Sequence, residues 1–279
     1  MTTVGILLTA ADNLTIDPIR SVFRKTFPST YISKNDKLAL LGCSIAYSWF
    51  NLTAAFNNCL GCSYNYNGIN YPVVFPPGFY SVSDISGFLA FTMKANGHYL
   101  LDQNLNEVYF LTLTVNEVYY AVTLTATPVP AVLPVGWTNV GGMVLTGLSP
   151  QLVISGATNW KTLIGYAGGT FPAAPSAIVY TVNSTAIPII SPITQVLIAA
   201  PNMVNNGTFS IFPSIIGSFL PNGTFGAPLS INPPVLTWYP VLPGNYNYID
   251  LQFLDQNYNP LQIKDSSQTV ISLLLQQPS

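Results

Sequence analysis

The sequence predicts an all-β protein, an antiparallel β-sandwich of the single jelly-roll type with one short helix. Hydrophobic residues make up 49% of the 279 residues, yet they occur in strand-sized segments separated by Pro, Gly, Asn, Ser and Thr. Roughly eight to ten such segments are present, and a single segment has helical periodicity. Eight antiparallel strands in two sheets are what a jelly roll needs.

The first predicted strand and a hairpin precede the helix. Apolar positions alternate within residues 38–50, which form the first predicted strand. Residues 63–75 form a predicted hairpin, because Asn67-Gly68 separates two apolar segments and this dipeptide favours a tight β-turn. A Pro-Pro-Gly sequence directly after residue 75 ends the hairpin.

The predicted helix begins at Ser83, a favourable N-cap residue, with Asp84 in the first turn near the positive end of the helix dipole. It ends at Asn96-Gly97, a common C-terminal stop. The spacing i, i+3, i+4, i+7, i+8 places a largely apolar stripe on one helix face. Its members are Ile85, Phe88, Leu89, Thr92 and Met93.

Several strands are predicted after the helix. Residues 108–115 and 118–125 are rich in Val, Thr, Leu and Tyr, which favour strands. A Pro/Gly-rich stretch at about 129–175 predicts long loops or an inserted subdomain, with Trp137 and Trp160 as candidate anchors. The remaining predicted strands are 178–182, 194–200, 208–212, 248–254 and 269–275.

The first 36 residues are predicted to form an N-terminal arm, separate from a jelly-roll domain at 37–279. Five of the eight basic residues lie in or next to this segment: Arg20, Arg24, Lys25, Lys34 and Lys37. Such an arm contacts either a neighbouring subunit or nucleic acid, or it is a solvated terminus.

Charge is the most unusual property of the composition. Charged residues make up only 6% of the chain, against about 25% in an average globular protein. The net charge of −2 gives no electrostatic basis for nucleic acid as the main ligand. Protein–protein interfaces are depleted of long charged side chains. The composition therefore favours a protein whose surface is covered by neighbours; the alternative is a secreted β-domain with a neutral surface.

A membrane span and a signal peptide are not predicted. The mean hydropathy of +0.40 is high, but no segment approaches the ~18 apolar residues of a spanning helix. The N-terminus has no basic residue before its short apolar stretch, unlike a secretory signal.

Motifs for catalysis or metal binding are weak. His98 is the single histidine, and general acid–base chemistry usually needs a group that titrates near neutrality. Cys59 and Cys62 form a C-x-x-C pair, but only Cys43 and His98 could complete a four-ligand zinc site, and neither has the required spacing. These thiols are interpreted as having no function, with a disulfide as the alternative.

A second motif begins at Asp255 and resembles the start of a calcium-binding loop. Pro260 stands where that loop needs glycine, and Ser266 stands where it needs glutamate. The segment is therefore predicted to be a turn in which Asp and Asn side chains bond to their own backbone. We predict no enzymatic activity, no cofactor and no metal site.

Three segments carry a family resemblance. They are residues 38–58 (LALLGCSIAYSWFNLTAAFNN), 75–89 (FPPGFYSVSDISGFL) and 244–276 (GNYNYIDLQFLDQNYNPLQIKDSSQTVISLLLQ). In this order and spacing they resemble the penton-type minor capsid proteins of virophages and polinton-like viruses. The resemblance covers most of residues 37–92 and 186–276, whereas 129–175 matches less clearly.

The resemblance implies a structural virion protein, with a single jelly roll present in five copies at each vertex of an icosahedral capsid. Trimers of a double-jelly-roll major capsid protein, and other minor capsid proteins, would be its neighbours. Nucleic acid would be contacted at most through the N-terminal arm. Closed five-fold symmetry requires a heterologous interface. Tyr47, Trp49 and Tyr80 are the candidate interface residues, with packing in the core as the alternative for each.

A function of a different class is host attachment or carbohydrate binding by a β-sandwich on a particle surface. Aromatic side chains on exposed loops would favour it, and the candidates are Trp137, Trp160 and residues 246–248.

Overall fold

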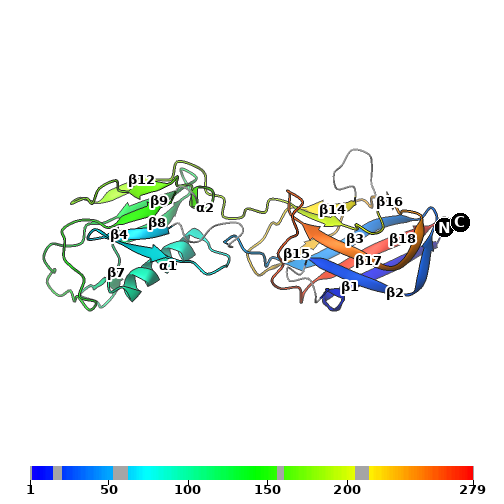
Figure 1. The fold of residues 1–279 in the computed structure, drawn as a ribbon, viewed down its shortest axis with the longest axis horizontal. Coiled ribbons are helices and arrows are strands. Elements are labelled where there is room, and N and C mark those ends of the chain that lie inside the picture. Colours follow the sequence, from blue (N-terminus) through cyan, green and yellow to red (C-terminus); the bar gives the residue numbers. More distant parts are fainter. Residues whose placement is uncertain (1, 15–20, 53–61, 156–159, 205–213, 279) are drawn as a thin grey trace. The chain divides into compact units, whose positions relative to one another are not determined.

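The computed structural model describes residues 2–14, 21–52, 62–155, 160–204 and 214–278. The chain divides into two compact units. Unit 1 comprises Met1–Trp49 and Ile193–Ser279, and unit 2 comprises Phe50–Pro192. Unit 2 is therefore an insertion into unit 1 (Figure 1).

Where the structure describes it, unit 1 consists of two antiparallel sheets (Figure 1). Sheet one has the order β1 (Thr2–Thr9), β18 (Val270–Gln277), β3 (Lys37–Ala46) and β15 (Pro228–Ile231), and β16 (Tyr239–Pro240) also pairs with β3. Sheet two has the order β14 (Ile215–Phe219), β13 (Val196–Ala199), β17 (Gly244–Leu254) and β2 (Val22–Ser33). A short 3-10 helix, η1 (Ala10–Asp12), connects β1 toward β2.

The strand order identifies the topology of unit 1. If the eight principal strands are renumbered from one to eight along unit 1, the two sheets have the orders 1-8-3-6 and 5-4-7-2. Successive strands alternate between the sheets, except that the fourth and fifth pair with each other in sheet two. This is the arrangement of the two Greek keys of a jelly roll. The predicted fold class, an all-β sandwich with a single jelly roll, is confirmed.

The pairing of β1 with β18 forms one edge of sheet one. It runs from Thr2 opposite Gln277 to Thr9 opposite Val270 without interruption. β17 pairs with β2 from Gly244 to Gln252 and contains one register shift. The side chains that point inward from both sheets are apolar and almost fully buried; they include Leu8, Phe23, Leu38, Ile45, Ile198, Ile249, Leu251, Phe253, Ile271 and Leu273.

The predicted N-terminal arm differs from the structure, because residues 1–36 contain two jelly-roll strands, β1 and β2. The basic residues were expected on an arm that either contacts a neighbouring subunit or nucleic acid or is a solvated terminus, but two of them lie on β2 and are paired. Arg24 forms a two-contact ion pair with Asp250, at 2.6 and 2.7 Å. Lys25 Nζ lies 3.1 Å from Asp12 Oδ1. Arg20 lies outside the described residues.

The predicted insertion at about 129–175 is also smaller than the inserted unit, which spans Phe50–Pro192 between β3 and β13. Unit 2 is itself rich in strands, so strand periodicity alone did not distinguish its strands from those of the sandwich. The predicted strand at 208–212 lies outside the described residues.

The described residues of unit 2 form three small antiparallel sheets and two helices. One sheet has the order β11 (Gly169–Phe171), β10 (Gln151–Ile154), β4 (Cys62–Tyr66) and β5 (Ile69–Val73). A second has the order β12 (Tyr180–Asn183), β9 (Ala121–Ala126) and β8 (Leu111–Asn116). β6 (Leu100–Leu101) pairs with β7 (Glu107–Val108), and the helices are α1 (Val82–Ala95) and α2 (Trp160–Ile164).

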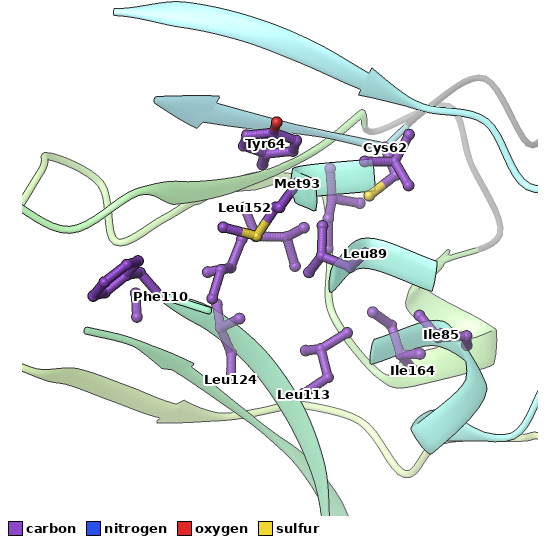
Figure 2. Close-up of a cluster of buried hydrophobic side chains, with 14 of the residues drawn as sticks. Cys62, Tyr64, Ile85, Leu89, Met93, Phe110, Leu113, Leu124, Leu152 and Ile164 are labelled. Carbon is purple, nitrogen blue, oxygen red and sulfur yellow. The ribbon is translucent and has the colours of Figure 1, made fainter. Parts of the chain in front are cut away.

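Helix α1 supplies part of the core of unit 2. Figure 2 shows Leu89 and Met93 between Tyr64 of β4 and Leu124 of β9. Each fully buried side chain of this size contributes roughly 1.5–3 kcal/mol. The four buried residues of the helix are Val82, Ile85, Leu89 and Met93.

The ends of α1 follow from local chemistry. Its N-cap is Ser81, two residues before the predicted one, because Ser81 and Asp84 form a reciprocal capping box. The helix ends as predicted at Asn96-Gly97, where Gly97 takes a positive φ of 74°. The predicted Asn67-Gly68 turn is likewise confirmed, with both residues at positive φ between β4 and β5.

Candidate functional site

Each of the two sheets of the jelly roll ends in an edge strand on either side, so the sandwich has two sides formed by edge strands. One side is formed by β1 and β2, and we call it the β1/β2 wall; the other is formed by β14 and β15, and we call it the β14/β15 wall. These strands are the opposite ends of the two sheets. Edge strands present unpaired N–H and C=O groups, so each wall is a place where another chain can add.

A groove of about 610 Å³ runs along the β1/β2 wall. β1 lines one side with Val4 and Leu7, whose side chains are 45% and 52% exposed. Phe27 and Tyr31 of β2 line the other side, with their ring centroids 5.8 Å apart. The groove is therefore open, apolar and partly aromatic.

β1 lacks the usual protection of an edge strand. Natural edge strands are commonly guarded by charged side chains, proline or a bulge. β2 has this protection in Arg24, Lys25 and Pro28, whereas the sequence of β1, TTVGILLT, contains neither charge nor proline. An uncharged eight-residue edge with exposed apolar side chains is prone to pairing with other chains unless a specific partner covers it.

Electrostatics keep the groove neutral. Its one charged lining residue, Lys25, is paired with Asp12. The hydroxyl of Tyr31 donates a hydrogen bond to Asp36. Burial, and after it this bond to a carboxylate, raise the pKa of Tyr31 to about 12, so the phenol stays neutral at physiological pH.

The β14/β15 wall lies within a long uncharged part of the chain. No Asp, Glu, Lys or Arg occurs anywhere in residues 162–249. Leu220, directly after β14, and Val235, in the loop after β15, are 63% and 74% exposed. A second groove, of about 300 Å³, lies between β14 and the loop that contains Pro233 and Pro234. Both walls thus expose apolar side chains, and among the described residues the two cations of β2, Arg24 and Lys25, are paired with carboxylates.

The predicted interface residues do not form one surface. Tyr47 and Trp49 are buried in unit 1, with their ring centroids 4.5 Å apart. Tyr47 also contacts Phe225, at 6.0 Å between centroids, and Phe225 is partly exposed. Tyr80 is a half-buried residue of unit 2 whose hydroxyl donates to Pro76 O at 2.9 Å. Because they are buried, Tyr47 and Trp49 cannot contact another chain directly; Tyr47 can only pack beneath the partly exposed Phe225.

Sequence reasoning missed the two walls. Val4 and Leu7 were assigned to an arm, and Val235 lay in a segment with no predicted strand. The absence of charge from residues 162–249 was readable in the sequence and would have indicated the β14/β15 wall.

The groups that were considered for chemistry are occupied by structural contacts. Tyr64 Oη and His98 Nδ1 are hydrogen-bonded at 2.8 Å, and the rings of Tyr66 and Tyr71 also contact the imidazole. Burial lowers the pKa of His98. Burial also raises the pKa of the Cys43 and Cys62 thiols to about 12. Cys59 lies outside the described residues.

The prediction of a backbone-bonding turn at Asp255 is confirmed. Asp255 Oδ1 accepts hydrogen bonds from the backbone amides of Asn257 and Asn259, at 2.7 and 2.9 Å. In the part of the chain that the structure describes, no three His, Cys, Asp or Glu side chains gather as a metal site would require. No helix of that part is long and apolar enough to span a membrane.

Comparison with known proteins finds likeness in structure only. No family model and no curated protein matches the sequence. The crystal structure of the mavirus penton protein, labelled with selenomethionine, is 12% identical, with 98% of each chain covered and a TM-score of 0.49. The 3.5 Å cryo-EM structure of the Sputnik virophage is 12% identical, with 99% of this chain and 97% of that chain covered and a TM-score of 0.41.

The first of these structures is a penton protein and the second comes from a virophage. Identity of 12% says nothing about function, because one fold serves many functions. The proposal for function therefore rests on the topology and surface of this chain.

Proposed function

We propose that this chain is a structural capsid protein that forms a homopentamer at the vertices of an icosahedral virion. The observation that carries the proposal is the pair of neutral walls at opposite ends of the same two sheets. A closed ring needs a heterologous interface in which one wall of each copy meets the other wall of the next. The copy number of five comes from the family that the sequence segments resemble.

The surface chemistry supports assembly over an isolated monomer. The β1 edge has no charge to keep other chains away, and the β14/β15 wall lies in the uncharged residues 162–249. Burying such walls desolvates few ions, so the usual electrostatic cost of association is small. The proposed role is binding to neighbouring copies and capsid proteins, with no catalytic step.

The mass of the purified full-length chain tests the proposal. We expect a discrete particle of five times the 30.1 kDa chain, measured by light scattering coupled to size exclusion. A chain that stays monomeric at micromolar concentration and at physiological salt would contradict the homopentamer. Addition of a double-jelly-roll major capsid protein as trimers is expected to produce co-sedimenting complexes, because those trimers are the proposed neighbours.

A second candidate function is attachment to a host surface or glycan through unit 2. The turn between β8 and β9 favours it, because Tyr119 and Tyr120 are 69% and 74% exposed there. The candidates named from sequence are less suitable: Trp137 packs against the core of unit 2, and Arg24 covers the ring of Tyr248 at 3.9 Å. Binding to a glycan array that is lost in a Tyr119→Ala, Tyr120→Ala variant would support this function.

A further inference from the structure

The groove of the β1/β2 wall requires an uncharged occupant. Val4, Leu7 and Phe27 make its sides apolar, and Leu275 of β18 also lines it. Lys25 is already neutralised by Asp12 at 3.1 Å. A charged group placed there would lose its hydration without finding an opposite charge, which is strongly unfavourable. The volume of about 610 Å³ lies within the range of sites that hold a few compact side chains.

A loop on the opposite wall has the matching chemistry. Residues 232–235, which we call the proline loop, have the sequence Asn-Pro-Pro-Val and connect β15 toward β16. Pro234 is exposed, and Val235 is 74% exposed. Proline has a fixed φ, so the loop loses little conformational entropy when it binds. Aromatic-lined grooves are the recurring receptors of such Pro-rich segments.

We propose that the proline loop of one copy inserts into the β1/β2 groove of the next copy, between β1 and the rings of Phe27 and Tyr31. This inference rests on the proposed ring, and it names the contact that closes it. The two surfaces agree in charge, because the loop has none and the groove has none left unpaired. They lie on opposite walls, so the contact is heterologous and repeats around a ring.

A charge-swap experiment tests the contact directly. Leu7→Lys puts a cation in the groove and Val235→Asp puts an anion on the loop; both positions are exposed in the single chain, so neither change disturbs its fold. We expect each single variant to raise the dissociation constant of the ring at least about tenfold, because each buries an unpaired charge. The double variant places one Lys opposite one Asp at every contact, and we expect it to recover most of that loss.

Val132→Asp is the matched control, since Val132 is 80% exposed but belongs to unit 2. We expect it to assemble like the wild type, and thermal unfolding checks that all variants are folded. If the wild type forms a ring and both single variants do too, the inference is overturned and the proposed function stands. Single variants that fail without rescue in the double variant also overturn it. A monomeric wild type contradicts the proposed function itself.

Discussion

The side-chain amide of Asn51 donates a hydrogen bond to the backbone carbonyl of Ile190, at 2.8 Å across 139 residues of sequence. The same amide donates to Tyr80 O at 2.8 Å, and Asn51 Oδ1 accepts from Tyr80 N at 2.9 Å. Asn51 is 1% exposed. One buried side chain therefore ties the segment that enters unit 2 to the segment that leaves it.

Replacing Asn51 with alanine is expected to destabilise unit 2 by about 2–4 kcal/mol. The change removes three hydrogen bonds to partly buried backbone groups of Tyr80 and Ile190. A fully buried group left without its bond costs about 1–3 kcal/mol. Urea denaturation followed by fluorescence measures the loss. Asn247→Ala is the control, because Asn247 makes its bond to Thr30 on the surface, and we expect a change within about 0.5 kcal/mol. Equal effects of the two changes would contradict the assignment.

Glycines in unit 2 differ in how much space is available for the Cβ of an alanine substitution. A Cβ at Gly141 would lie 2.2 Å from Gly97 O, whereas a Cβ at Gly87 within α1 has nothing within 4 Å. We expect Gly141→Ala to destabilise unit 2 by about 1–3 kcal/mol through overpacking. Gly87→Ala should stabilise it by about 0.5–1 kcal/mol, because alanine favours a helix interior. Thermal shifts of opposite sign are the expected result, and shifts of the same sign would refute this packing argument.

His98 gives unit 2 a pH dependence. Burial lowers its pKa in the folded chain below the usual 6.5, so the unfolded chain binds more protons as the pH falls. The free energy of unfolding is then at its full value well above pH 6.5 and falls as the pH drops below it, so it is smaller at pH 5 than at pH 7.5. His98→Gln is expected to abolish this slope, measured by urea denaturation at both pH values. An unchanged slope in the variant would show that another group titrates.

The buried thiols are expected to be unreactive in the folded protein. Cys43 and Cys62 are 4% and 6% exposed, and burial raises the pKa of each to about 12, so almost no thiolate forms near neutral pH. In a Cys59→Ser variant, a thiol reagent at pH 7.5 should label neither cysteine within minutes. After unfolding in urea it should label both. Rapid labelling of the folded variant would contradict the burial of these residues.

Local features of the fold were predictable because short-range chemistry determines them. The Asn67-Gly68 turn, the end of α1 at Asn96-Gly97 and the turn at Asp255 each depend on residues within a few positions. The N-cap is Ser81 and not the predicted Ser83, and this difference has a local cause too. Only Ser81 has an acidic residue, Asp84, three positions after it. Val118 favours a strand by composition, yet β9 begins only at Ala121, and Tyr120 at a positive φ of 48° lies in the turn before it.

The pairing of strands that lie far apart in the sequence could not be predicted. β1 is a short apolar stretch whose partner, β18, lies at the other end of the chain. The limits of the inserted unit depend on contacts such as that of Asn51 with Ile190. The number of strands and the family resemblance both predicted the jelly roll. The candidate interface residues Tyr47 and Trp49 are nevertheless buried, since aromatic side chains are as common in cores as at interfaces.

The pairing of Thr2 with Gln277 also constrains the biosynthesis of the protein. During translation β1 has no partner in its sheet until β18 has left the ribosome. Until then its uncharged apolar sequence is open to incorrect pairing, and nascent chains with exposed strand edges aggregate readily. Production in a heterologous host is therefore expected to benefit from slow translation and from chaperones that shield the N-terminal segment.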